Sequence, residues 1–188
     1  MNEPNTLSST LSSTLSVPFF SDPDRLEKFR AIALTWVHTK FVPHAAMRGV
    51  GVDCVHLAAR IYQECGLFAD YGFPAYTMDG GRHLQRSLVT DWLDSHPSFQ
   101  KLHYDSPTFG LSQLLDAIAP GDLICFNIVR VPHHCGLFYM HSGRMFIHAM
   151  HRYGVCFGNL QDPTYRTNVT AIYRPVSPSV PSPEVSDV

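Results

Sequence analysis

The chain has 188 residues, of which 45% are hydrophobic and 12% aromatic, and its formal net charge is −2 at pH 7. This length and apolar content suffice for one compact domain with a sizeable core and are too small for two. The balanced charge and the lack of any Lys and Arg cluster exclude a nucleic-acid surface of the usual basic kind. No apolar run approaches the roughly 20 residues needed to cross a bilayer, so no membrane partner is expected.

The N-terminus lacks the basic segment and the continuous apolar segment of a secretory signal, which predicts a protein that is cytoplasmic as synthesised. The five cysteines are an odd number and too sparse for a disulfide framework, as is typical of a reducing compartment. Histidine is frequent, with eleven residues, and several of them crowd between His133 and His151. This concentration of histidines makes the second half of the chain a candidate location for functional residues.

Composition divides the chain into one folded unit with two polar ends. Residues 1–16 contain a quasi-repeat of Ser, Thr and isolated Leu, which predicts a disordered leader. Residues 176–188 place three prolines among Ser and Val, which predicts a disordered tail. The single folded domain is therefore expected to span residues 17–175.

Helical patterns occupy the first half of the folded unit. Ser21 or Asp22 can cap a first helix, and apolar residues keep helical spacing as far as Phe41. Two shorter helices are expected at 84–93 and 112–118. Five short β-rich segments then follow one another, at 123–128, 134–140, 144–148, 154–157 and 169–174. Helices first and an antiparallel sheet second describe an α+β domain.

The helix expected after residue 53 carries the first candidate for chemistry. Asp53 can serve as its N-cap, Cys54 falls in its first turn, and Gly66 can end it. A thiol at a helix N-terminus lies at the positive end of the helix dipole, which favours the nucleophilic thiolate. The alternative is that Cys54 is a small apolar residue packed beneath the helix start. An irregular aromatic stretch over 66–81 can form one wall of a site beside it.

The strand expected at 134–140 carries the second candidate. Strand alternation places His134 and Gly136 on one face of the sheet. A three-residue hairpin loop at 141–143 would pair Gly136 with His148, so that both histidines lie on the same face and within about 7–8 Å of each other. A one-residue error in register would separate them onto opposite faces. Paired in this way, the two imidazoles suit a general base and its orienting partner, opposite Cys54.

A metal site is the alternative use of the histidine-rich region, because imidazole and thiolate are zinc ligands. The spacings do not match the paired ligand motifs of zinc sites, and strand alternation divides neighbouring candidates between two faces. We therefore expect neither a metal nor another cofactor. The candidate ligands are His133, His134, Cys135, His141, His148, His151 and Cys156. Cys65 is expected in the core, and no chemistry is assigned to Cys125, Cys135 or Cys156.

Four motifs occur in order along the chain: Gly51-Val52-Asp53-Cys54, Pro120-Gly121-Asp122-Leu123, His134-x-Gly136-Leu137-Phe138 and Ile147-His148-Ala149. Together they resemble the NlpC family of papain-like cysteine peptidases, which cut bacterial cell-wall peptides. The lead-in over 41–51 looks most like the branch of this family found in phage tails. The resemblance implies a papain-like core in which the cysteine helix packs on an antiparallel sheet of about five to six strands.

The resemblance also implies site residues. Cys54 would be the nucleophile, His134 the base and His148 the polar residue that orients the imidazole of His134. The Asp beside the family's nucleophile helps to hold the free amine of the substrate, a role that would fall to Asp53. We expect His56 and His44 to lie at the substrate beside it.

Two departures from the family pattern bear on the substrate. Val55-His56 stands where the family usually has Ser-Gly, so a hydroxyl is lost and a bulky titratable ring is gained. His133 beside His134 offers a second candidate base, but adjacent strand residues point in opposite directions and the motif selects His134.

The function expected from these residues is hydrolysis of amide bonds, in peptidoglycan stem peptides or related cell-wall peptides, through a thioester acyl-enzyme. The backbone N–H of Cys54 is the expected oxyanion donor, a contact typically worth about 3 kcal/mol. Two alternatives stay open: an inactive binding module of a phage-tail-like particle, and an acyltransferase or amidase on a non-wall substrate. The expected partners are a peptide or peptidoglycan fragment and other components of such a particle, which would also deliver the protein.

Overall fold

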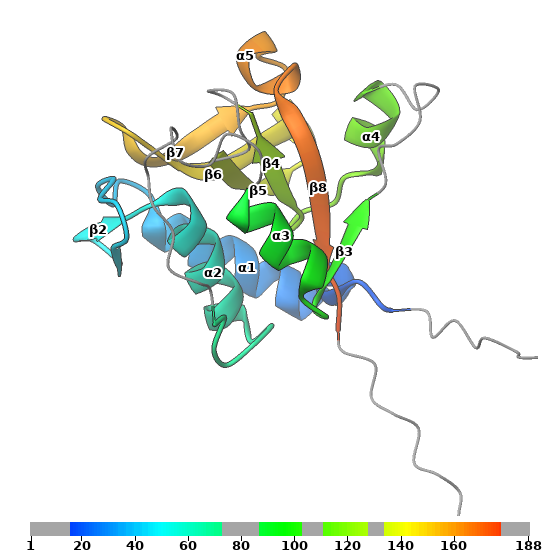
Figure 1. Cartoon of the computed structure of the whole chain (residues 1–188), viewed down its shortest axis with the longest axis horizontal. Helices are drawn as coiled ribbons and strands as arrows, with labels where there is room; N and C mark the ends of the chain where they lie inside the picture. The colour runs from blue at the N-terminus through cyan, green and yellow to red at the C-terminus, as the bar shows by residue number, and fades with distance from the viewer. Residues whose placement is uncertain (1–15, 73–86, 103–110, 128–133, 178–188) are drawn as a thin grey trace, which may run out of the picture.

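The structure is a computed structural model that describes residues 16–72, 87–102, 111–127 and 134–177. Within these residues the chain is an α+β domain in which helices cover a six-stranded antiparallel sheet, as the sequence predicts (Figure 1). The strand order across the sheet is β3-β8-β4-β5-β6-β7. The strands are β3 (Phe99–Leu102), β4 (Leu123–Phe126), β5 (His134–Met140), β6 (Met145–Met150), β7 (Gly154–Asn159) and β8 (Val169–Pro175).

Two longer helices, α1 (Pro23–Trp36) and α2 (Cys54–Cys65), lie side by side, and α2 packs on the central strands β5 and β6 (Figure 1). None of the helices in the described residues is long and apolar enough to cross a membrane. The shorter elements are a hairpin of β1 (Ala46–Met47) and β2 (Gly51–Val52), the helices α3 (Leu88–Ser95), α4 (Leu111–Ala117) and α5 (Pro163–Arg166), and the 3₁₀ turns η1 (Phe19–Ser21) and η2 (Ser142–Arg144).

The first helix is shorter than its apolar spacing predicts. Asp22 is its N-cap and accepts a backbone hydrogen bond at 2.9 Å, but α1 ends at Trp36 and not at Phe41. The chain turns at His38, whose φ is 69°, and the N–H of His38 donates to the carbonyl of Val155 at 2.9 Å. The residues after Trp36 therefore bond to β7 and leave the helix.

The sheet has two chemically different sides. One side is covered by α1 and α2, and we call it the helix side; its strand residues include Cys125, Cys135, Leu137, Ile147 and Tyr173. The residues that alternate with these point the other way and form the aromatic side, which includes Ile124, Phe126, Phe138, Phe146 and Ile172. Tyr165 of α5 packs on the aromatic side, with its ring centroid 4.9 Å from that of Phe146.

The β5–β6 hairpin differs from the predicted one at its turn and agrees with it at the site. A loop over 141–143 would pair Met140 with Arg144, whereas the structure pairs Met140 with Met145. A register shift between Phe138 and Met140 absorbs the extra residue, and Leu137 pairs with Ile147. Continued by one residue, this register sets Gly136 opposite His148, because the bulge lies between the turn and the site.

The sequence analysis does not predict the edge strand β3, the β1–β2 hairpin or α5. β3 is mostly exposed or half-buried, and it is a strand because Phe99 pairs with Pro175 and Leu102 with Ile172 of β8. Such pairing joins segments far apart in the sequence, so hydrophobic periodicity within either segment does not predict it.

The ordered chain continues beyond the domain boundary expected at residue 175. Val176 is buried, its N–H donates to the carbonyl of Ser98 at 2.8 Å, and it bridges to Pro18 in antiparallel fashion. The two ends of the described chain are thereby held side by side at the β3–β8 edge (Figure 1).

Candidate active site

Cys54 is the first residue of α2, and the capping residue Asp53 alone separates it from the short strand β2. Asp53 caps the helix as predicted, since its Oδ1 accepts the N–H of His56 at 2.9 Å. Gly66 ends the helix in the left-handed conformation, with a φ of 89°. The Cys54 side chain is buried at 5% exposure, at the positive end of the helix dipole.

The carboxylate of Asp53 is occupied by donors from the protein itself. Besides the backbone of His56, Oδ1 accepts a hydrogen bond from His56 Nδ1 at 3.0 Å, and Oδ2 accepts the N–H of His44 at 2.7 Å. Asp53 has 0% exposure, so it ties the preceding loop to the start of α2 from inside the protein. His44 is exposed, and the side chain of His56 is 16% exposed beside the ring of Tyr71. Of the three predicted substrate residues, the two histidines therefore reach the surface.

His134 and His148 lie together on the aromatic side of the sheet. His134 Nε2 and His148 Nδ1 are 2.7 Å apart, a hydrogen-bonding distance. The ring of His134 also packs on Phe126, and the ring of His148 packs on Phe146. The predicted sharing of one face by the two histidines is thus what the hairpin register produces.

The imidazole of His134 lies near enough to the Cys54 thiol to lower its pKa, through hydrogen bonding and charge. Because His134 Nε2 is engaged with His148, Nδ1 is the nitrogen left for the sulfur. The three residues therefore form one line of contacts, from sulfur to imidazole to imidazole. This is the order in which a nucleophile, its base and an orienting group act in thiol hydrolases.

The sequence analysis expects the sulfur and the two imidazoles to meet across one face of the sheet, and this is not what the structure shows. Helix α2 covers the helix side, whereas both imidazole rings lie on the aromatic side. His134 is the first residue of β5, so Cys54 meets it at the end of that strand. The next residue, Cys135, points to the helix side and lies in the same buried cluster as Cys54, whose pKa it lowers.

Gly136 leaves the room that the two imidazoles need. A Cβ at this position would lie 2.7 Å from Cδ2 of Phe146 and 3.2 Å from Cβ of His148. It would also lie 3.0 Å from the carbonyl oxygen of Ile147. Any side chain here would have to displace Phe146 and His148, which the packed sheet does not allow without strain.

The surroundings of Cys54 favour its thiolate. The hydrogen bond with Cys135, together with the hydrogen bond and charge of His134, holds the pKa of the Cys54 thiol well below its ordinary value, although burial opposes this. In contrast, burial raises the pKa of Cys65, at the other end of the same helix, to about 12. The pKa values of the two cysteines of α2 are therefore shifted in opposite directions by their surroundings.

His148 stays neutral. It is 1% exposed, and burial, assisted by the nearby charge of His134, lowers the pKa of its imidazole to about 3. A neutral His148 that accepts a hydrogen bond at Nδ1 carries its own proton on Nε2. His148 can therefore orient a protonated His134 without competing for its proton.

Cys135 is the site residue that the sequence analysis missed. Strand alternation does place it on the face opposite His134, and the helix that begins with Cys54 covers that face. No group of three or more His, Cys, Asp or Glu side chains among the described residues is placed to hold a metal ion. His133, one of the candidate ligands and the alternative base, lies outside the described residues.

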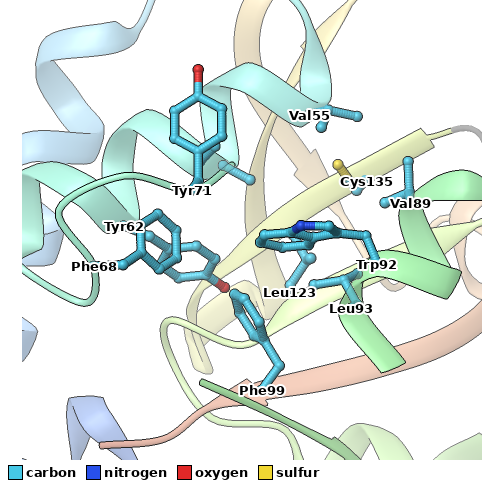
Figure 2. A pocket seen from close by; sticks show the side chains of 12 residues that line it. Val55, Tyr62, Phe68, Tyr71, Val89, Trp92, Leu93, Phe99, Leu123 and Cys135 are labelled. Carbon is cyan, nitrogen blue, oxygen red and sulfur yellow. The ribbon is translucent and has the colours of Figure 1, made fainter. Parts of the chain in front are cut away.

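A small apolar pocket of about 30 Å³ adjoins the nucleophile, between α2 and α3 (Figure 2). Val55 and Cys135, the neighbours of Cys54 in sequence and in space, line one end of it, and Phe68 lines the other. Trp92 lies between them in Figure 2. None of the described residues that line the pocket is charged.

Comparison with known proteins identifies the fold. No protein-family model and no curated protein matches the sequence. Among solved structures, a Staphylococcus aureus protein of the NLP/P60 family, described as similar to lipoprotein, aligns over 88% of this chain with a TM-score of 0.55 and 18% identity. NlpC2 and NlpC1 from Trichomonas vaginalis each align over 81% of it, with TM-scores of 0.52 and 0.51 and identities of 20% and 21%.

The chain therefore has the fold of NlpC/P60 proteins. It spans 45%, 46% and 44% of the lengths of these three proteins, which makes it about as long as half of each. The likeness to the phage-tail branch, which the lead-in over 41–51 indicates, stays a prediction.

Proposed function

We propose that this protein is a cysteine peptidase or amidase that hydrolyses amide bonds through a thioester intermediate. The observation that carries the proposal is the pair of imidazoles on one face of the sheet, with 2.7 Å between His134 Nε2 and His148 Nδ1, together with Cys54 at the start of α2. Its support is chemical: a thiol with a lowered pKa lies at a helix start beside an imidazole. A buried neutral group holds that imidazole in place.

In the first step, the Cys54 thiolate attacks the carbonyl carbon of the amide. His134, protonated at Nδ1, gives this proton to the departing nitrogen, so the C–N bond breaks and a thioester and a free amine form. In the second step, His134 removes a proton from water, and the resulting hydroxide attacks the thioester. The C–S bond breaks to give a carboxylic acid and the Cys54 thiolate, and His134 keeps the proton taken from water, so the starting pair is restored.

His148 has a supporting role throughout this sequence. It accepts the Nε2 proton of His134, which fixes the ring with Nδ1 toward the sulfur. The backbone N–H of Cys54, at the start of α2, is the donor we assign to the oxyanion, a contact that typically contributes about 3 kcal/mol. No metal or organic cofactor enters either step.

The proposed substrate is a peptide amide, and the motifs that resemble the NlpC family favour peptidoglycan stem peptides. The pocket beside Cys54 supports a small alkyl group next to the scissile bond, because a charged group there would lose its hydration without a partner among the described lining residues. Synthetic peptides that differ only in Ala, Leu or Glu beside the cleaved bond test this point. A preference for Ala over Glu is expected, and equal cleavage of all three would contradict it.

A second candidate, an amidase acting on a substrate without a free amine, is supported by the burial of Asp53. Both oxygens of this carboxylate are bonded inside the protein, so an amine held by Asp53 would have to displace His44 or His56. Acetylation of the substrate N-terminus distinguishes the two. It abolishes cleavage if the amine is required and leaves the rate unchanged if it is not.

The central experiment compares Cys54→Ala with Cys65→Ala on purified peptidoglycan, with the fragments identified by mass spectrometry. Both cysteines are buried in α2, so the two variants change the same helix by the same amount. Cys54→Ala should release no fragments, and Cys65→Ala should keep the wild-type products. Fragment release by Cys54→Ala would overturn the proposed mechanism. If wild type releases none, synthetic amides and labelling of Cys54 with iodoacetamide decide whether the thiol is reactive at all.

A further inference from the structure

We propose that Tyr165 of α5 is a positioning residue whose ring covers His148 and keeps water away from the hydrogen bond between His148 and His134. The proposal deepens the proposed function, and its meaning for catalysis rests on that function, because His134 needs orientation only if it serves Cys54. It gives α5, a short helix to which the hydrolytic steps assign no task, a part in holding the base.

Three aromatic rings pack against the two imidazoles on the aromatic side of the sheet. The ring centroid of Tyr165 lies 5.4 Å from that of His148, at an interplanar angle of 79°. Tyr165 also meets Phe146 and Phe126, with centroid distances of 4.9 Å and 5.8 Å. Phe146 supports the imidazole of His148, and Phe126 supports that of His134. Tyr165 therefore contacts one imidazole directly and the aromatic supports of both.

Burial shows that Tyr165 is the outer ring of this group. Tyr165 is half-buried, whereas His148, Phe126 and Phe146 are buried. Its ring therefore lies between the solvent and the imidazole of His148. A hydrogen bond from which water is excluded in this way is electrostatically stronger than one in contact with water.

Hydrogen bonds before and after α5 fix the place of Tyr165 over the sheet. Asp162 caps the helix, since its Oδ1 accepts the N–H of Thr164 at 2.8 Å. Two residues after the helix, the carbonyl of Asn168 accepts the N–H of Asn127 at 2.7 Å. Asn127 directly follows β4, so this second bond ties the end of α5 to the sheet.

Several titratable groups face His148 from neighbouring elements. Cys156 lies directly opposite it on β7, and burial raises the pKa of both Cys156 and Tyr165, so these two groups are uncharged at neutral pH. His134 on β5 is a third, and its charge opposes a second charge on His148. Burial, to which the ring of Tyr165 contributes, is the larger cause of the lowered pKa of His148.

Water at His148 would remove the acceptor on which His134 depends. A neutral imidazole can accept at Nδ1, but a protonated one carries N–H groups on both nitrogens and accepts nothing. Without the ring of Tyr165, the pKa of His148 should rise toward the ordinary value of about 6.5. The bond to His134 would then be lost in mildly acidic solution and kept above neutral pH.

The test follows the protonation of His148 directly, by NMR of the full chain labelled with ¹⁵N in its histidine rings, from about pH 5 to about pH 8. The signals of His148 are assigned by their absence from the spectrum of His148→Phe. Tyr165→Ala removes the ring and Tyr165→Phe keeps it. Arg166→Ala is the matched control, because it changes an exposed residue next to Tyr165 in the same helix.

In the wild type, Tyr165→Phe and Arg166→Ala, His148 should stay neutral down to about pH 5, whereas in Tyr165→Ala it should titrate with a midpoint near 6.5. On a cleaved peptide amide, kcat/KM of Tyr165→Ala should be about tenfold below the wild type at about pH 5.5 and equal to it at about pH 8, because at pH 5.5 only about one His148 in eleven would be neutral. A purely structural defect would lower the rate at both pH values.

Three outcomes would overturn the role of Tyr165. They are a His148 that stays neutral in Tyr165→Ala, a wild-type His148 that already titrates near the ordinary value of about 6.5, and equal shifts in Tyr165→Ala and Arg166→Ala. If Tyr165→Ala fails to fold, Tyr165→Leu, which keeps an apolar side chain without the ring, carries the same test. The NMR result does not depend on turnover. A wild type that cleaves no amide but shows the expected titration would therefore count against the proposed function alone.

Discussion

The two sides of the sheet contribute different chemistry to the same sulfur. The helix side carries thiols, with Cys125 and Cys135 beneath α2, and the aromatic side carries imidazoles among phenylalanine rings. Neither side alone holds a complete site. They meet at His134-Cys135, adjacent residues that point in opposite directions at the start of β5.

The two sides of the sheet differ in how their buried groups handle protons. On the aromatic side burial keeps His148 neutral, so its Nδ1 can accept the hydrogen bond from His134 Nε2. On the helix side Cys54 and burial raise the pKa of the Cys135 thiol, so that thiol keeps its proton. The nucleophile lies between an imidazole that can exchange protons and a thiol that does not, so proton transfer is confined to the aromatic side. Changes on each side should therefore have distinguishable effects.

The largest effect should come from removing the imidazole at the meeting point. His134→Ala should lower kcat/KM on a peptide amide by about 10³-fold, because proton transfer by a positioned group contributes roughly 10²–10⁴-fold. His151→Ala, which changes an exposed histidine in the turn between β6 and β7, is the control and should keep the wild-type rate. Loss of activity in both variants would mean that the assay reports folding and not the site.

The next effect is on stability and concerns the buried neutral His148. Its pKa is about 3 in the folded protein and about 6.5 when unfolded, so between these values the unfolded chain binds more protons. Its contribution is therefore lost as pH falls from about 6.5 toward 3. The wild type should lose on the order of 4 kcal/mol more unfolding free energy than His148→Phe across this window.

Urea unfolding of both proteins at several pH values measures this difference. In this pH window the wild type should take up one more proton on unfolding than His148→Phe does, which sets the difference between their slopes of unfolding free energy against pH. Equal slopes would show that His148 titrates normally in the folded protein. In that case the neutral acceptor on the aromatic side would be lost from the mechanism.

A smaller effect is expected at the space between the imidazoles. Gly136→Ala would bring a methyl group within 2.7 Å of Phe146 and 3.2 Å of His148 Cβ, and overpacking of this kind costs about 2 kcal/mol. The measurement is the unfolding free energy, accompanied by iodoacetamide labelling of Cys54. Because the crowding falls on the aromatic side, the orientation of His134 should suffer while Cys135 is untouched. A fully stable variant with normal kcat would contradict the packing described for this side.

The smallest effect should appear at the start of α2. His56→Ala removes the hydrogen bond from Nδ1 to Asp53 but keeps the backbone N–H that caps the helix. The expected loss is about 1 kcal/mol of unfolding free energy, as for a typical single hydrogen bond. Thermal unfolding measures it, and a loss above about 3 kcal/mol would mean that the ring supports more than this one contact.

Local chemistry within a few residues determined much of this protein. The caps of α2 at Asp53 and Gly66 and the strand from His134 to Met140 follow from side-chain type and spacing alone. These features depend on hydrogen bonds and periodicities that close within one turn or one strand. The order of the motifs likewise indicated the α+β class and the line from Cys54 to His134 to His148.

Only the tertiary structure decided which side of the sheet α2 covers, that Asp53 is turned inward, and that Cys135 shares a buried cluster with Cys54. It also decided that the bulge before Met140 restores the register at His148 and that β3 joins the sheet. Each of these depends on contacts between segments far apart in the chain. Their free energy comes from burying surfaces that no single segment contains, so a local pattern does not encode them.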